Sequence, residues 1–125
     1  MKRLFVLMVL CLGLACCGTA QNSGFTSLGN EEFAKVIQKK KTQLVDVRTP
    51  KEYAEGHLPK AINLDVNNKS FETIAEEKLN KRKPVAVYCR SGKRSKIAAT
   101  KLSAQGYTVY ELDRGILHWD GEVVK

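Results

Sequence analysis

The sequence predicts an α/β fold built on a mostly parallel sheet. Short apolar segments with strand character alternate along the chain with longer segments of helical periodicity, which is the pattern of parallel strands joined by helices. One segment, residues 85–88, is apolar on both faces, as a central strand of such a sheet should be. The 125 residues, 43% of them hydrophobic and 27% charged, suit one globular domain.

The first predicted strand and helix occupy residues 25–41. Residues 25–28 form a short strand, and Asn30 is a suitable N-cap for the helix that follows. The inner face of this helix carries apolar residues at helical spacing: Phe33, Val36 and Ile37. Three lysines at positions 39–41 close the helix, where the helix dipole favours positive charge.

The second and third predicted strands flank a short helix. The second strand covers residues 43–48 and the third covers residues 61–64. Between them, Thr49 and Glu52 have the spacing of a capping box, and Pro50 occupies the first helical position. Gly56 suits the position just beyond the end of a helix, so we expect this helix to be short.

The second half of the chain continues the alternation. Ser70 is predicted to cap a helix whose apolar face carries Phe71, Ile74, Ala75 and Leu79. The fourth strand, residues 85–88, leads through a loop into a helix over residues 97–105, which Gly106 ends. Residues 107–112 are the fifth strand, and residues 116–119 form a last helical turn.

A cysteine stands where the predicted central strand ends. The segment from residue 89 to residue 95, which we call the cysteine loop, reads Cys89-Arg90-Ser91-Gly92-Lys93-Arg94-Ser95. A loop of this kind can turn backbone N–H groups inward to bind an anion, and the helix that follows adds partial positive charge. Together with three cations, these groups favour the nucleophilic thiolate. They make an inert buried cysteine the weaker interpretation.

The cysteine loop resembles the active-site loop of the rhodanese sulfurtransferases. Three further segments fit the same family: DVRTPKEY at residues 46–53, GHLPKAINL at 56–64 and LDRGILHW at 112–119. The resemblance runs from about residue 25 to residue 119. It implies a single rhodanese-like domain over residues 25–125, with five mostly parallel strands and helices on both faces of the sheet.

The resemblance implies sulfur transfer by covalent catalysis. Cys89 would attack the outer sulfur of thiosulfate or a similar donor, sulfite would leave, and a thiol or cyanide would take the sulfur from the resulting persulfide. The loop amides would hold the anion that forms on Cys89. Arg94 is expected to bind the donor or the leaving sulfite. The residues expected to bind substrate are Arg90, Ser91, Gly92, Lys93, Arg94 and Ser95.

Residues outside the loop are assigned supporting roles. Asp46 and Arg48 end the second predicted strand, and we expect them to hydrogen-bond the loop or a neighbouring backbone rather than to take part in catalysis. In the family, the histidine that corresponds to His57 has a structural role. Trp119 is interpreted as a packing residue. No cluster of histidine, cysteine or carboxylate residues suggests a metal site, and we expect no cofactor.

A cysteine phosphatase or an arsenate reductase is the alternative enzyme. Those proteins also place a cysteine at the end of a strand, but their signature has five residues between the cysteine and the arginine. Here four residues separate Cys89 from Arg94, so the loop is one residue shorter. The nearest carboxylates along the chain, Glu77 and Glu111, lie outside the loop and offer no clear acid for a leaving alcohol. A shorter, tighter loop favours an anion on the cysteine's own persulfide.

The formal net charge of +8 is compatible with nucleic acid, an acidic membrane surface or a small anionic substrate. Basic residues form only short runs without interleaved aromatic residues, so we expect no nucleic-acid partner. We expect a monomer that meets a small anionic sulfur donor and a thiol acceptor. A sulfur-carrier or regulatory binding module is the remaining alternative, and the intact Cys89 argues against a purely regulatory one.

Residues 1–20 are predicted to be an export signal. Lys2 and Arg3 precede an apolar stretch over residues 4–15 that is too short to span a bilayer comfortably, and small residues lead to a cleavage site after Ala20. A lipoprotein signal is the alternative, with Cys16 or Cys17 lipidated. The protein would be periplasmic, or membrane-anchored if lipidated, with a flexible lead-in at residues 21–24. Cleavage after Ala20 would leave one cysteine and no internal disulfide.

Overall fold

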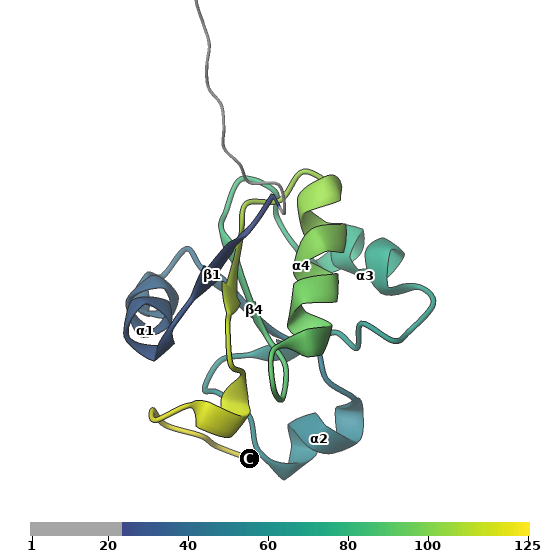
Figure 1. Cartoon of the computed structure of the whole chain (residues 1–125). Helices are drawn as coiled ribbons and strands as arrows, with labels where there is room; N and C mark the ends of the chain where they lie inside the picture. The colour runs from purple at the N-terminus through teal and green to yellow at the C-terminus, as the bar shows by residue number, and fades with distance from the viewer. Residues whose placement is uncertain (1–23) are drawn as a thin grey trace, which may run out of the picture.

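Figure 1 shows the fold of the chain, a computed structural model in which residues 24–125 are described. The predicted export signal, with Cys16 and Cys17, and residues 21–23 of the predicted lead-in lie outside the described residues. In the described part of the chain, no helix is long and apolar enough to cross a membrane.

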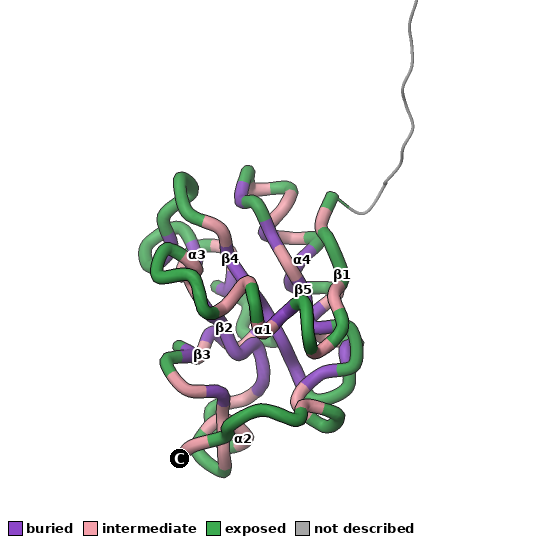
Figure 2. The backbone as a smooth tube through the Cα atoms, turned by 90° about the vertical axis from the view of Figure 1, so that its left-hand side faces the viewer, coloured by how far each residue is buried: buried purple, intermediate pink, exposed green. Residues whose placement is uncertain are grey.

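The sheet has five parallel strands, as the sequence predicts. The strands are β1 (Thr26–Leu28), β2 (Gln43–Asp46), β3 (Ile62–Asn63), β4 (Val85–Tyr88) and β5 (Val109–Leu112). They lie in the order β1-β5-β4-β2-β3, and every neighbouring pair is parallel. β4 is therefore the central strand, and all four of its residues are buried. Figure 2 shows the buried strands enclosed by more exposed helices and loops.

Helices cover both faces of the sheet. The helices are α1 (Asn30–Gln38), α2 (Pro50–Glu55), α3 (Phe71–Lys78), α4 (Lys93–Ala104) and the short 3-10 helix η2 (Ile116–His118). On one face, Phe71 of α3 and Leu102 of α4 pack against Val87 and Val109 of the sheet. On the other face, Phe33 of α1 packs with strand residues and with the η2 region. Figure 1 shows α1 on one side of the strands and α3 and α4 on the other.

Two element boundaries differ from the prediction in ways that concern the cysteine loop. The helix expected over residues 97–105 begins at Lys93, because Gly92 adopts a left-handed conformation (φ 106°) and the chain turns into helix directly after it. Lys93, Arg94 and Ser95 therefore lie in the first turn of α4. The second strand ends at Asp46 rather than at residue 48, so Arg48 lies just beyond it.

Smaller differences affect the outer elements. The third strand is shorter than expected, and the fifth begins at Val109 rather than at residue 107. The predicted cap Asn30 is instead the first residue of α1, and its side-chain amide donates to the His118 carbonyl at 2.7 Å, which ties α1 to η2. Ser70 occupies the N-cap of α3 but makes no side-chain capping bond. The capping box of α2 is confirmed: the Thr49 hydroxyl accepts from the Glu52 N–H, and the Glu52 carboxylate accepts from the Thr49 N–H.

Candidate active site

Cys89 lies at the carboxyl end of the central strand and is only 1% exposed. The Gly92 N–H donates to its sulfur at 3.1 Å, and the sulfur also lies 3.5 Å from the Ser95 hydroxyl. The helix start at Lys93 places the positive end of the α4 dipole beside this position. In open parallel sheets, ligand sites form beyond the carboxyl ends of strands, so this is where an active site is expected.

The segment after β5 holds the cysteine loop in place. The Ile116 N–H donates to the Cys89 carbonyl at 2.9 Å, and the Leu117 N–H donates to the Arg90 carbonyl at 3.0 Å. Gly115 has a φ of 71°, and a Cβ there would lie 2.2 Å from the Arg90 carbonyl oxygen. The sequence of residues 112–119 resembles that of the family. In the structure, this segment supports the backbone of the cysteine loop.

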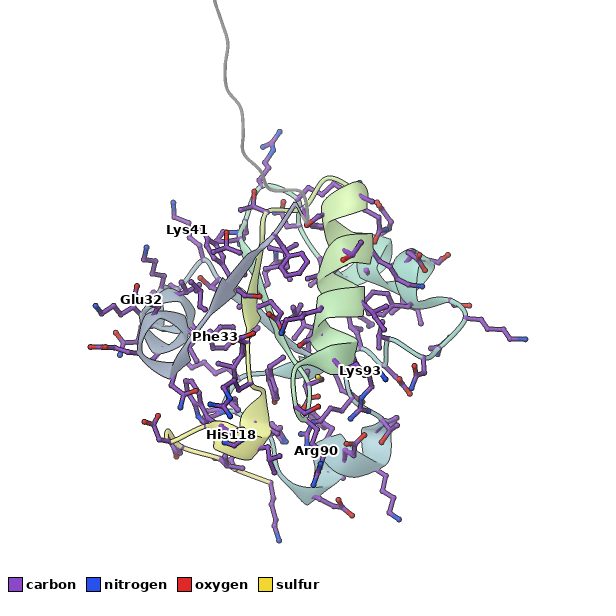
Figure 3. All side chains as sticks on the ribbon, viewed as in Figure 1. Glu32, Phe33, Lys41, Arg90, Lys93 and His118 are labelled. Atoms are coloured by element: carbon purple, nitrogen blue, oxygen red, sulfur yellow. The ribbon has the colours of Figure 1, made fainter. Side chains whose placement is uncertain are left out.

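The cations of the loop divide into two groups. Arg90 and Lys93 are exposed, and within the described residues neither forms an ion pair; Figure 3 shows Lys93 at the start of α4 and Arg90 below it in the view, toward α2. Arg94, for which we predict a role in binding the donor, donates to both oxygens of Glu52 in this structure, at 2.7 and 2.9 Å. Of the three predicted cations, Arg90 and Lys93 are therefore available to an incoming anion without breaking an existing pair.

The ion pair between Arg94 and Glu52 links α4 to α2. The hydrogen bonds from Arg94, helped by those from the Thr49 N–H and hydroxyl, lower the pKa of Glu52 from 4.5 to about 2. The same pairing raises the pKa of Arg94 above its usual value. Because Glu52 also completes the capping box of α2, one carboxylate fixes the helix end and the loop arginine together.

This pairing predicts a pH-dependent contribution to stability. Because the pKa of Glu52 is lower in the folded state, its contribution is present above pH 4.5 and is lost as the pH falls toward about 2. We expect Glu52→Gln, which preserves the capping geometry, to lower the free energy of unfolding at neutral pH. Urea unfolding at several pH values should show the wild type and the variant converging on acidification. A difference that stays constant from pH 7 to pH 3 would contradict this role.

Asp46 and Arg48 form a buried ion pair beside the loop, not within it. Arg48 donates to the Asp46 carboxylate at 2.6 Å and to the Gly56 carbonyl at 2.6 Å, and Asp46 also accepts from the Arg48 N–H. These contacts fix the turn that leads from β2 into α2. Within the described residues, the structure gives no hydrogen bond from this pair to the cysteine loop. Their contacts fit the predicted role of supporting a neighbouring backbone.

The remaining predicted residues lie in packing contacts. The His57 ring stacks on Tyr53 with centroids 3.8 Å apart, and its Nδ1 lies 2.9 Å from the Tyr53 carbonyl oxygen. Trp119 meets Phe33 edge to face at 6.0 Å. Neither residue contacts Cys89 through any hydrogen bond in the described part of the chain. Residues 24–125 contain no group of three or more histidine, cysteine or acidic residues arranged to hold a metal ion.

Glu111 is the residue that sequence reasoning misplaced. It lies outside the loop along the chain, but in space its carboxylate accepts from the Ser95 hydroxyl at 2.5 Å and is completely buried. Lys96 and Ser27 donate to the same carboxylate, at 3.2 and 2.5 Å. A charged residue at position 111, inside the predicted fifth strand, was the available signal.

Known proteins resemble this chain in sequence and in fold. The family described as rhodanese-like domain matches residues 29–122. A sulfurtransferase of Allochromatium vinosum is 42% identical over 77 residues, covering 61% of this chain and 69% of that protein. The thiosulfate sulfurtransferase GlpE of Pseudomonas syringae is 36% identical over 89 residues, covering 70% of this chain and 81% of that protein.

A longer relative and a solved structure complete the comparison. A tRNA uridine(34) hydroxylase of Pelagibacter ubique is 32% identical over 102 residues; the match covers 81% of this chain but 34% of that protein. The chain therefore matches about a third of that relative's length. The crystal structure of the BH2092 protein of Bacillus halodurans superposes with a TM-score of 0.70 at 29% identity, covering 79% of this chain and 76% of that one.

Proposed function

This chain belongs to the rhodanese-like domain family, and from this we propose that it is a sulfurtransferase that works through a persulfide on Cys89. The donor is thiosulfate or a similar small anion that carries a sulfane sulfur, and the acceptor is a thiol or cyanide. Two relatives of this chain are named as sulfurtransferases, and one of those names specifies thiosulfate.

One observation carries the proposal: the Cys89 sulfur accepts the Gly92 N–H at 3.1 Å at the amino end of α4. A sulfur in this position gains from the N–H donor and from the helix dipole when it becomes an anion. The exposed Arg90 and Lys93 add positive potential at the surface that a donor must approach. The site therefore suits an anionic donor and a sulfur nucleophile.

The reaction proceeds in two displacements at sulfur. In the first, the Cys89 thiolate attacks the outer sulfur of the donor. A new S–S bond forms, the bond to the sulfite sulfur breaks, and sulfite leaves with the electron pair. In the second, the acceptor thiolate or cyanide attacks the outer sulfur of the persulfide, and Cys89 leaves as a thiolate. The proton of the resting thiol passes to solvent, and no external oxidant or reductant is needed.

Hydrolysis of phosphate esters is the competing activity, and two features weigh against it. Four residues separate Cys89 from Arg94, one fewer than the phosphatase signature has. The Arg94 guanidinium that would have to hold a phosphate is bound to both oxygens of Glu52. A phosphate would have to displace a bidentate ion pair before it could be held in the loop.

We test the proposal by measuring turnover with two substrate pairs on the same preparation. We expect thiosulfate with cyanide to give steady formation of thiocyanate, and we expect an aryl phosphate to be hydrolysed at or near the background rate. Replacing both exposed cations, by Arg90→Gln with Lys93→Gln, should raise the KM for thiosulfate several-fold because the positive potential is lost.

A matched control removes a lysine on another helix, by Lys78→Gln at the exposed end of α3, and should leave the KM for thiosulfate near the wild-type value. Faster hydrolysis of aryl phosphate than sulfur transfer would overturn the proposal. Formation of a stable persulfide without turnover to cyanide or to any thiol would instead identify a sulfur carrier.

A further inference from the structure

A buried carboxylate lies one hydroxyl group away from the candidate nucleophile. Glu111 of β5 is fully buried, yet both of its oxygens accept hydrogen bonds: Oε1 from Ser27 of β1 at 2.5 Å, and Oε2 from Ser95 of α4 at 2.5 Å. Lys96 of α4 donates to Oε2 at 3.2 Å. Two oxygens that only accept, with an ammonium beside them, are the pattern of an ionised carboxylate. The two displacements at Cys89 make no use of this group.

The hydroxyl of Ser95 has one proton and three neighbours that can accept a hydrogen bond. These are the Glu111 carboxylate at 2.5 Å, the Gly92 carbonyl at 3.1 Å and the Cys89 sulfur at 3.5 Å. The Glu111 carboxylate lies at the shortest of these distances, so the Ser95 hydroxyl directs its proton to that carboxylate in a charge-assisted hydrogen bond. Ser95 then presents a lone pair to the sulfur, where it accepts from the Cys89 S–H and offers no donor to a thiolate.

We propose that Glu111 is a positioning residue that keeps Cys89 a thiol in the resting protein by fixing the direction of the Ser95 hydroxyl. The contact between Ser95 and the sulfur favours the protonated form, since a thiolate would face a lone pair instead of a proton. The Gly92 N–H, which donates to the same sulfur at 3.1 Å, has the opposite effect and favours the thiolate. Glu111 thus sets the balance between two opposing contacts at one sulfur atom.

The same arrangement distinguishes the empty from the loaded protein, a consequence that rests on the proposed function. When Cys89 carries a persulfide, the negative charge resides on the outer sulfur, and the inner sulfur is bonded on both sides and uncharged. The unfavourable contact with the Ser95 lone pair then disappears. Glu111 therefore destabilises the free thiolate more than the persulfide, which slows the release of sulfur, because release must regenerate the thiolate.

Other charged groups face this network from several elements. Lys96 also lies 2.9 Å from Asp113 Oδ1, just after β5, so its ammonium is shared between two carboxylates. On the sulfur side, Arg94 interacts electrostatically with Cys89 and with Asp65, while its hydrogen bonds go to Glu52. The exposed cations of the loop complete the set: Arg90 and Lys93. Removing the Glu111 charge leaves all of these groups in place.

The test is the pH dependence of Cys89 alkylation by iodoacetamide, which reports the thiolate whether or not the protein transfers sulfur. We expect Glu111→Gln to lower the midpoint of the profile by about one pH unit, so that alkylation below the midpoint is about tenfold faster. Glutamine is a weaker acceptor for Ser95, which frees the hydroxyl to donate to the thiolate. The control Asp113→Asn removes the other carboxylate that pairs with Lys96 and leaves Ser95 unchanged. It should shift the midpoint much less.

Ser95→Ala provides an independent arm that does not require Glu111→Gln to fold. It removes the lone pair that faces the sulfur, so the midpoint should also fall, and Glu111→Gln should add little in that background. A midpoint that rises in Ser95→Ala would show that Ser95 donates to the thiolate and would overturn the proposal, as would an unchanged midpoint in a folded Glu111→Gln. If the alkylation midpoints shift in the variants as expected but the protein transfers no sulfur, only the proposed function would be refuted.

Discussion

Replacing Cys89 by serine is expected to lower the rate of sulfur transfer by at least about a thousandfold, since loss of a nucleophile removes the covalent route altogether. A hydroxyl at this position cannot form the persulfide. The Gly92 N–H that the sulfur accepts at 3.1 Å can still be accepted by the serine oxygen, so the loop keeps its hydrogen bond. The rate of thiocyanate formation from thiosulfate and cyanide measures the loss.

The fold should survive this change, which separates chemistry from structure. Serine differs from cysteine by one atom, and Ser95 offers a polar neighbour near the buried position. We therefore expect thermal unfolding close to that of the wild type, with Cys89→Ala as a second variant that carries no polar group. Retention of most of the sulfur-transfer rate in either folded variant would show that Cys89 is not the nucleophile.

Gly92→Ala is expected to produce the second large effect, in stability and in activity together. Gly92 adopts a φ of 106°, and a Cβ there would lie 2.0 Å from the carbonyl oxygen of Asp113. The loop must therefore move away from the segment after β5, at a cost of about 3 kcal/mol in the free energy of unfolding. Because its N–H would move with it, the donor to the Cys89 sulfur would be lost, and the sulfur-transfer rate should fall about a hundredfold.

The matched control for this variant is Gly29→Ala. Gly29 is also a glycine at a helix N-cap, but its φ is −77°, and apart from its chain neighbours no atom lies within 4 Å of the Cβ position. We expect only a small loss of stability, as for other changes at exposed helix caps, and an unchanged sulfur-transfer rate. If both variants unfold at the same urea concentration, the close approach of Gly92 to Asp113 has no energetic importance.

Local patterns were sufficient to predict the fold and the place of Cys89, the candidate nucleophile, at the end of the central strand. The apolar run of β4, the capping box at Thr49 and the glycine after the cysteine each depend on a few neighbouring residues, and each is found in the structure. Alternation of strands and helices then requires crossovers, and crossovers require parallel strands. The carboxyl end of the central strand follows as the place for the site.

The partners of individual charges could not be predicted in this way. Arg94 pairs with Glu52, 42 positions earlier in the sequence, and Ser95 contacts Glu111, 16 positions later. Both contacts depend on the start of α4 at Lys93, which was predicted four residues too late. An α-helix has 3.6 residues per turn, so the prediction lacked the whole first turn of α4, and the directions of the Arg94 and Ser95 side chains were left undefined.

The most direct test of the account is the mass of the intact protein after reaction with thiosulfate and removal of the excess donor. We expect the gain of one sulfur atom, located on Cys89 by peptide mapping, absent from Cys89→Ser and removed by a reducing thiol. An unchanged mass in a protein whose Cys89 can still be alkylated, or a sulfur atom carried by any other residue, would contradict the central claim that this chain transfers sulfur through Cys89.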